Sequence, residues 1–261
     1  MRTFLILFTK EMQESIRNGK WIWLPITLIV IGISQPITSY YMPQLLEMAG
    51  NLPEGTVIEL PTPSGAEVLS GTLSQYGMIG TLLFILASMN MIAHERRNGS
   101  LTFIMVRPVH SVHFILSKYV AHFFILSVSM FLSYLLTWYY TNVLFSSVSF
   151  EIMIKSFLTY HLWLLLTIAV VTFVSTVIKQ SGGIAGVSVV ALVGITVLSQ
   201  LLPKYMEWSP ANLSNEAMFI LMNEPSSHFW IVCTSSLIIT ALLVIAAIFQ
   251  FQRSEHHQAD Q

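Results

Sequence analysis

The sequence predicts an all-α integral membrane protein with six transmembrane helices, and three observations lead to this fold class. Of the 261 residues, 54% are hydrophobic and only 10% are charged, whereas about a quarter of the residues in a soluble domain are charged. Six apolar runs come close to the roughly 20 residues that a helix needs to cross a bilayer. The basic residues gather in alternate connecting segments. The six predicted spans cover about residues 21–42, 75–92, 119–144, 157–178, 182–202 and 229–249.

The distribution of lysine and arginine predicts the orientation of these spans. If both termini are cytoplasmic, only Lys155 and Lys204 of the twelve basic residues lie outside. Because basic loops are retained on the cytoplasmic side, we expect a multi-pass protein of the cell (plasma) membrane with both ends inside. The inner basic residues are then Arg2, Lys10, Arg17, Lys20, Arg96, Arg97, Arg107, Lys118, Lys179 and Arg253.

Residues 1–20, ahead of the first span, predict an amphipathic interfacial helix. Apolar side chains recur at close to helical spacing from Phe4 to Ile16, and charged side chains fall on another face. We expect this helix to lie on the inner leaflet against membrane lipids. The alternative is a cytoplasmic extension of the first span. The charged positions of the interfacial helix are Lys10, Glu11, Glu14 and Arg17.

Two outer loops and one helix-packing pattern complete the predicted permease domain of residues 21–261. The outer loop 43–74 contains four prolines and no basic residue, and it is either a gate or a solvated connector. The outer loop 203–228 contains an apolar stretch too short to span, which favours a partly re-entrant hairpin. In the fifth span, small residues are spaced for close contact with another helix. They are Gly182, Gly186 and Gly194.

The cytoplasmic loop 93–118 has the densest charge of the chain. Gly99 permits a turn with positive φ, and Ser100 can cap a following helix. Leu101 belongs to the apolar stripe of that helix, and Pro108 ends it. A short helix held away from the membrane would be a lever that a soluble partner can push. For Arg107 and Lys118, anchoring at the inner leaflet is an equally good interpretation.

This loop resembles the hallmark of ABC-2 type permeases. The run Glu95-Arg96-Arg97-Asn98-Gly99-Ser100-Leu101, followed by Pro108-Val109 and Lys118, is similar to E-[RK]-x-x-G-[ST]-L … P-[VI] … K between the second and third spans. The six-span layout and the amphipathic start extend the resemblance over essentially the full chain. The coupling residues that it implies are Glu95, Arg96, Arg97, Gly99, Ser100, Leu101, Pro108 and Lys118.

The resemblance implies the membrane half of an ATP-driven exporter. Two copies of a separate ATP-binding subunit, which would hold the ATP and magnesium, would dock beneath the loop. A second permease subunit, identical or related, would complete the assembly. The alternative function is a membrane receptor or immunity protein that binds a ligand without net transport.

Motifs for enzyme chemistry are missing from the sequence. His94-Glu95 begins like the zinc motif H-E-x-x-H, but Asn98 replaces the second histidine, and no P-loop occurs. We therefore expect no catalytic residue, metal site or cofactor in this chain. The net charge of −1 argues against a nucleic-acid partner. His122 and His161 lie within predicted spans and either contact cargo or protons or bond to neighbouring helices.

Overall fold

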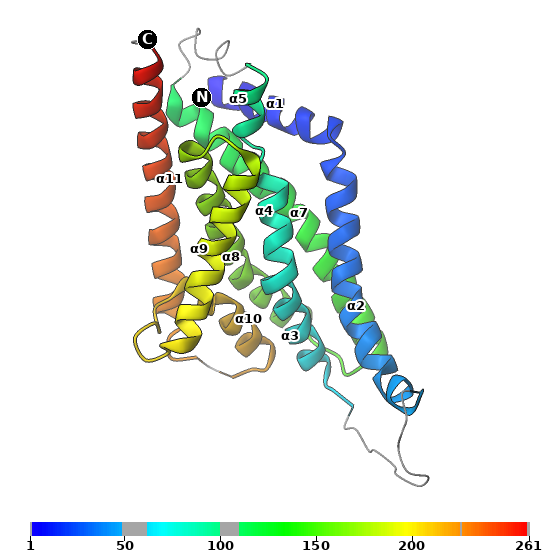
Figure 1. The fold of residues 1–261 in the computed structure, drawn as a ribbon. Coiled ribbons are helices and arrows are strands. Elements are labelled where there is room, and N and C mark those ends of the chain that lie inside the picture. Colours follow the sequence, from blue (N-terminus) through cyan, green and yellow to red (C-terminus); the bar gives the residue numbers. More distant parts are fainter. Residues whose placement is uncertain (1, 49–61, 100–109, 225, 260–261) are drawn as a thin grey trace.

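The computed structural model describes residues 2–48, 62–99, 110–224 and 226–259, and every regular element in these ranges is helical. Six of the described helices are long and apolar enough to cross a membrane, and they form a bundle (Figure 1). The predicted all-α fold class with six spans is thus confirmed for the described part of the chain. The six candidate spans are Lys20–Leu45, Gly65–Arg97, Ser111–Leu144, Phe150–Val177, Ser181–Leu201 and Phe229–Arg253.

The chain begins with two helices joined by a sharp bend. Helix α1 (Arg2–Arg17) ends just before Gly19, whose φ of 67° lies in the left-handed region that favours glycine. Helix α2 (Lys20–Met48) follows and is the first span. Figure 1 shows α1 lying across one end of the bundle, at an angle to α2.

The second span is assembled from several helical pieces. They are α3 (Gly65–Gln75), the π-helical turn η1 (Tyr76–Gly80), α4 (Thr81–Ser88) and α5 (Ala93–Arg97). The predicted outer loop 43–74 is too long at both ends. Helix α2 continues to Met48, and α3 begins at Gly65, ten residues before the predicted start of the second span at residue 75. A capping box between Ser64 and Glu67 starts α3. Hydropathy missed α3 because its small and polar residues are stabilised by burial against the bundle.

The remaining elements are α7 (Ser111–Leu144), α8 (Phe150–Val177), α9 (Ser181–Leu201), η2 (Pro210–Asn212), α10 (Leu213–Leu221) and α11 (Phe229–Ala259). The end of the predicted loop 93–118 forms the first turns of α7, which starts at Ser111, as expected of a serine that can start a helical run into the third span. Helix α8 is the centre of the bundle, because most of its apolar residues are buried, whereas most of those in α2 and α9 are not. Helix α10, within the predicted outer loop 203–228, packs against α8 and α3.

The three glycines of α9 do not mediate close packing within the described part of this chain. A methyl group added to Gly182, Gly186 or Gly194 would meet no atom within 4 Å. The helix instead buries another face, which includes Ile184 and Leu192, against α8.

Candidate functional site

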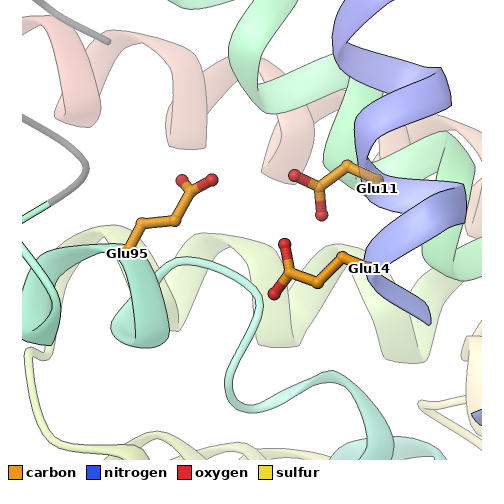
Figure 2. Close-up of side chains that lie close together, drawn as sticks. All are labelled: Glu11, Glu14 and Glu95. Carbon is orange, nitrogen blue, oxygen red and sulfur yellow. The ribbon is translucent and has the colours of Figure 1, made fainter. Parts of the chain in front are cut away.

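Four charged side chains meet where α1, α5 and α7 come together, and we call them the charged cluster. They are Lys10 and Glu11 from α1, Glu95 from α5 and Lys118 from α7. The Lys118 Nζ lies 2.8 Å from Glu11 Oε1 and 3.2 Å from Glu95 Oε2. The Lys10 ammonium donates to Glu95 and lies 3.7 Å from Glu11 Oε1. Figure 2 shows the carboxylates of Glu11 and Glu95 approaching each other from the two helices.

The charged cluster is buried, and its two lysines balance its two glutamates. Exposure is 5% for Glu11, 2% for Glu95 and 2% for Lys118, whereas Lys10 is partly open to solvent. Burial alone would lower the pKa of Lys10, but the hydrogen bond and attraction of Glu95 outweigh it and leave the pKa raised. Removing any one charge would leave a buried partner uncompensated, which is strongly unfavourable.

A third carboxylate, Glu14, lies beside the cluster on α1 (Figure 2). Oxygen atoms of Glu11, Glu14 and Glu95 lie within 4.8 Å of one another, a spacing that could hold a metal ion. However, the ammonium groups of Lys10 and Lys118 already pair with two of these carboxylates. The arrangement therefore fits an ion-pair cluster better than a metal centre.

Lys20 and His122 extend this polar region toward α4. The Lys20 Nζ donates to the Ala87 carbonyl at 2.9 Å and lies 3.2 Å from His122 Nε2. The other ring nitrogen of His122 lies 3.0 Å from the Lys118 carbonyl oxygen. Since both ring nitrogens have protein neighbours, His122 links α2 to α7 beside the charged cluster.

A cavity of about 310 Å³ opens beside these residues. Its polar lining residues are Glu11, Glu14, Ser15, Asn18, Lys20, Asn90, His94 and His122. The second intramembrane histidine, His161, lies elsewhere: it is buried, with its Nδ1 3.2 Å from the Phe157 carbonyl oxygen and its ring close to that of Phe157. Only His122 of the two thus lines this cavity.

Arg96 connects the predicted coupling segment to the central helix. Its guanidinium donates to backbone carbonyl oxygens at the C-terminal end of α8, where cations are favoured by the helix dipole. The distances are 2.8 Å to Ser175, 3.1 Å to Thr176 and 3.3 Å to Ile178. Arg96 therefore satisfies carbonyls that the end of α8 leaves open.

Arg97 makes the corresponding connection to α9. It donates to Asn90 Oδ1 at 3.0 Å, and the same oxygen accepts a 2.6 Å hydrogen bond from Ser181, the first residue of α9. The α5 segment is consequently tied to α1, α7, α8 and α9 at one end of the bundle.

The other predicted site residues have mixed outcomes. Gly99 has a φ of 68°, as its turn requires, whereas Ser100, Leu101 and Pro108 lie outside the described residues. Arg17 is exposed in the last turn of α1. Glu11 and Lys118 are both buried. For Glu11 this differs from the charged outer face predicted for the amphipathic helix, and for Lys118 it argues against the alternative of an anchor at the inner leaflet.

Sequence reasoning missed the pairing within the charged cluster, although a signal was present. Lys118 shares a helical stripe with Phe114, Ile115 and His122, all buried. Glu11 shares a face of α1 with the buried Ser15. A charged residue on a buried stripe requires a partner of opposite sign. This requirement could have suggested that Lys118 on α7 pairs with Glu11 on α1.

Comparisons with known proteins place the chain among membrane proteins. The family described as "Protein of unknown function (DUF2705)" matches residues 37–256. The chain is also 34% identical over 258 residues to the "Uncharacterized transmembrane protein YxlG" of Bacillus subtilis (strain 168), covering 98% of this chain and 100% of that relative. Together with the six apolar helices, this relative supports a multi-pass membrane protein.

Proposed function

The chain belongs to the DUF2705 family, and from this premise we propose that it is the permease subunit of an ATP-driven exporter of the ABC-2 type. In this proposal the chain forms the translocation path in the plasma membrane, with both termini in the cytoplasm. Two copies of a separate ATP-binding subunit hydrolyse ATP, and a second permease subunit completes the path.

The observation that carries this proposal is the charged cluster. It joins α5, where the ABC-2-like motif begins, to α1 and to the start of α7 through Glu95, Glu11 and Lys118. Because buried ion pairs are costly to separate, these three elements would move together. A force applied to the segment after Gly99 would thus reach two membrane-spanning helices directly.

The exposed side chains of helix α1 support the proposed position of the charged cluster at the inner leaflet. Its charged face contributes Lys10 and Glu11 to the cluster. Its Leu5, Ile6 and Ile16 are 59%, 69% and 63% exposed, as expected of side chains that face lipid. The helix would therefore contact both the lipid surface and the coupling segment.

A reconstitution experiment tests the proposal. The chain is purified with a candidate ATP-binding subunit, and ATP hydrolysis is measured in liposomes with and without the chain. We expect the chain to stimulate hydrolysis, and Glu95→Gln to reduce the stimulation at least tenfold. Glu207→Gln, an exposed carboxylate outside the cluster, is the matched control and should behave like the wild type.

Two results would contradict the exporter. One is that no ATP-binding subunit associates with the chain. The other is a ligand response that the chain gives alone and that Glu95→Gln leaves unchanged, which is the behaviour of a receptor or immunity protein without net transport.

A further inference from the structure

Helix α10 lies at the opposite end of the bundle from α1 and α5 (Figure 1). Its residues Glu216, Phe219 and Ile220 line a second cavity. Its volume of about 530 Å³ falls in the range of small-molecule sites. Helices α8, α10 and α11 contribute most of its wall, which is largely apolar and aromatic. The apolar lining residues are Leu158, Phe219, Ile220, Phe229 and Trp230.

One buried carboxylate, that of Glu216 on α10, lines this apolar cavity. Glu216 is only 4% exposed. Its Oε1 accepts a hydrogen bond from Ser226 Oγ at 2.8 Å. Its Oε2 is also buried and has no hydrogen-bond partner among the described residues. Buried carboxylate oxygens are normally paired, so the charge of Glu216 is only partly compensated beside this cavity.

The charges around the cavity determine the sign of that ligand. The exposed Glu224 adds a second carboxylate to the lining. Lys155 also lines the cavity, but its ammonium is bound by Glu151 at 2.6 Å and is largely exposed. The lining thus holds two carboxylates and one ammonium. Because that ammonium is already paired with Glu151 outside the lining, the cavity attracts a cation and disfavours an anion.

We propose that this cavity binds a lipophilic organic monocation, with Glu216 as its counter-charge. The apolar wall would take the body of the ligand, and the rings of Phe219, Phe229 and Trp230 would add cation–π attraction. The negative charge of Glu216 would attract the positive centre of the ligand. This site stands on the cavity alone, whether or not the chain is an exporter.

Binding of tetraphenylphosphonium to the full chain in lipid nanodiscs tests the proposal. Equilibrium dialysis, with empty nanodiscs as the background, should show saturable binding to the wild type. Glu216→Gln removes the charge with little change of shape and should weaken binding at least tenfold, or about 1.4 kcal/mol. Glu224→Gln at the exposed rim should change the affinity less than threefold. Tetraphenylborate, of the same shape and opposite charge, should not bind saturably.

A second variant keeps the test decisive if Glu216→Gln does not fold. Leu158 lies in the cavity wall but is 59% exposed, so Leu158→Trp can fill the cavity without disturbing the core, and it should abolish binding. The proposal is overturned if Glu216→Gln or Leu158→Trp binds tetraphenylphosphonium as tightly as the wild type does. It is also overturned if only Glu224→Gln lowers the affinity, or if tetraphenylborate binds as tightly as tetraphenylphosphonium. Uptake equal to that of empty nanodiscs also overturns it.

Discussion

Lys118 carries a positive charge, yet its side chain is only 2% exposed within the helical bundle. It is tolerated because two carboxylates lie within 3.2 Å of its Nζ. The gain from such pairs hardly exceeds the cost of removing the charges from water. The ion pairs therefore contribute more to determining which helices meet than to net stability. Removing one member of a pair nevertheless destabilises the fold, because the other charge is left buried without its partner.

Replacing Lys118 should show this cost directly. Lys118→Met would remove the ammonium that pairs with both Glu11 and Glu95, and we expect a loss of about 3–5 kcal/mol. Thermal unfolding of the detergent-purified protein measures the change. Lys155→Met is the matched control, since its pair with Glu151 is exposed and is worth about 0–1 kcal/mol. Equal losses in both variants would contradict the role given to Lys118.

Lys10 allows a prediction about pH. Its pKa is raised above the ordinary value of 10.5 in the folded state, so its stabilising contribution is complete below about pH 10.5 and is lost only as the pH rises through the folded-state pKa. We expect the difference in melting temperature between the wild type and Lys10→Met to be constant from about pH 6 to pH 9. A difference that shrinks within this window would show that another group controls the pair.

At the scale of elements, α2 and α7 approach each other at a glycine. Gly32 of α2 faces a stripe of buried hydroxyl groups on α7 and the Tyr76 hydroxyl, and a methyl group there would lie only 2.8 Å from Ser133 Oγ. The hydroxyls recur every four residues, and most bond back to the preceding turn of α7. The stripe consists of Ser129, Ser133, Thr137 and Thr141.

Gly32→Ala should separate these two helices. The added methyl group would overlap the hydroxyls of Thr137 and Tyr76, and overpacking of this kind costs about 1–3 kcal/mol. In contrast, Gly186→Ala on α9 meets nothing within 4 Å and should be neutral, or stabilising by about 0.4–1 kcal/mol. The melting temperatures of the two purified variants, each compared with that of the wild type, test this expectation. A Gly32→Ala variant that melts above the wild type would refute the packing argument.

At the scale of the whole molecule, the two ends of the bundle differ in chemistry. The end formed by α1 and α5 contains the charged cluster, and the end formed by α10 contains the cavity with Glu216. Under the proposed orientation, the first end is cytoplasmic and the second is external. Loop exposure in cells therefore tests the orientation independently of any transport assay.

Cysteine labelling provides that test. Cys233 is the single cysteine, so Cys233→Ser gives a background without thiols. On it, Asn98→Cys places a thiol beside Gly99, and Lys204→Cys places one after α9, both at exposed positions. A membrane-impermeant maleimide should label Lys204→Cys in intact cells and Asn98→Cys only after permeabilisation. The reverse pattern would invert the topology and remove the basis for cytoplasmic coupling.

Much of the fold was predictable from the sequence because spanning a bilayer requires long apolar runs, which are visible along the chain. Gly99 was also predictable, since a turn with positive φ is a local requirement. The start of α3 at Gly65 was not, because hydropathy does not register a helix whose small and polar residues are buried by neighbouring helices.

The sequence by itself determined the membrane class, the six spans and the positions of the charges. Only the tertiary structure decided which charges meet: Lys118 and Glu11 are 107 residues apart along the chain, and nothing local links them. It also decided that Glu216 lines an apolar cavity while Glu224 stays exposed. Hydropathy and spacing are properties of neighbouring residues, whereas burial and ion pairing depend on how distant helices pack.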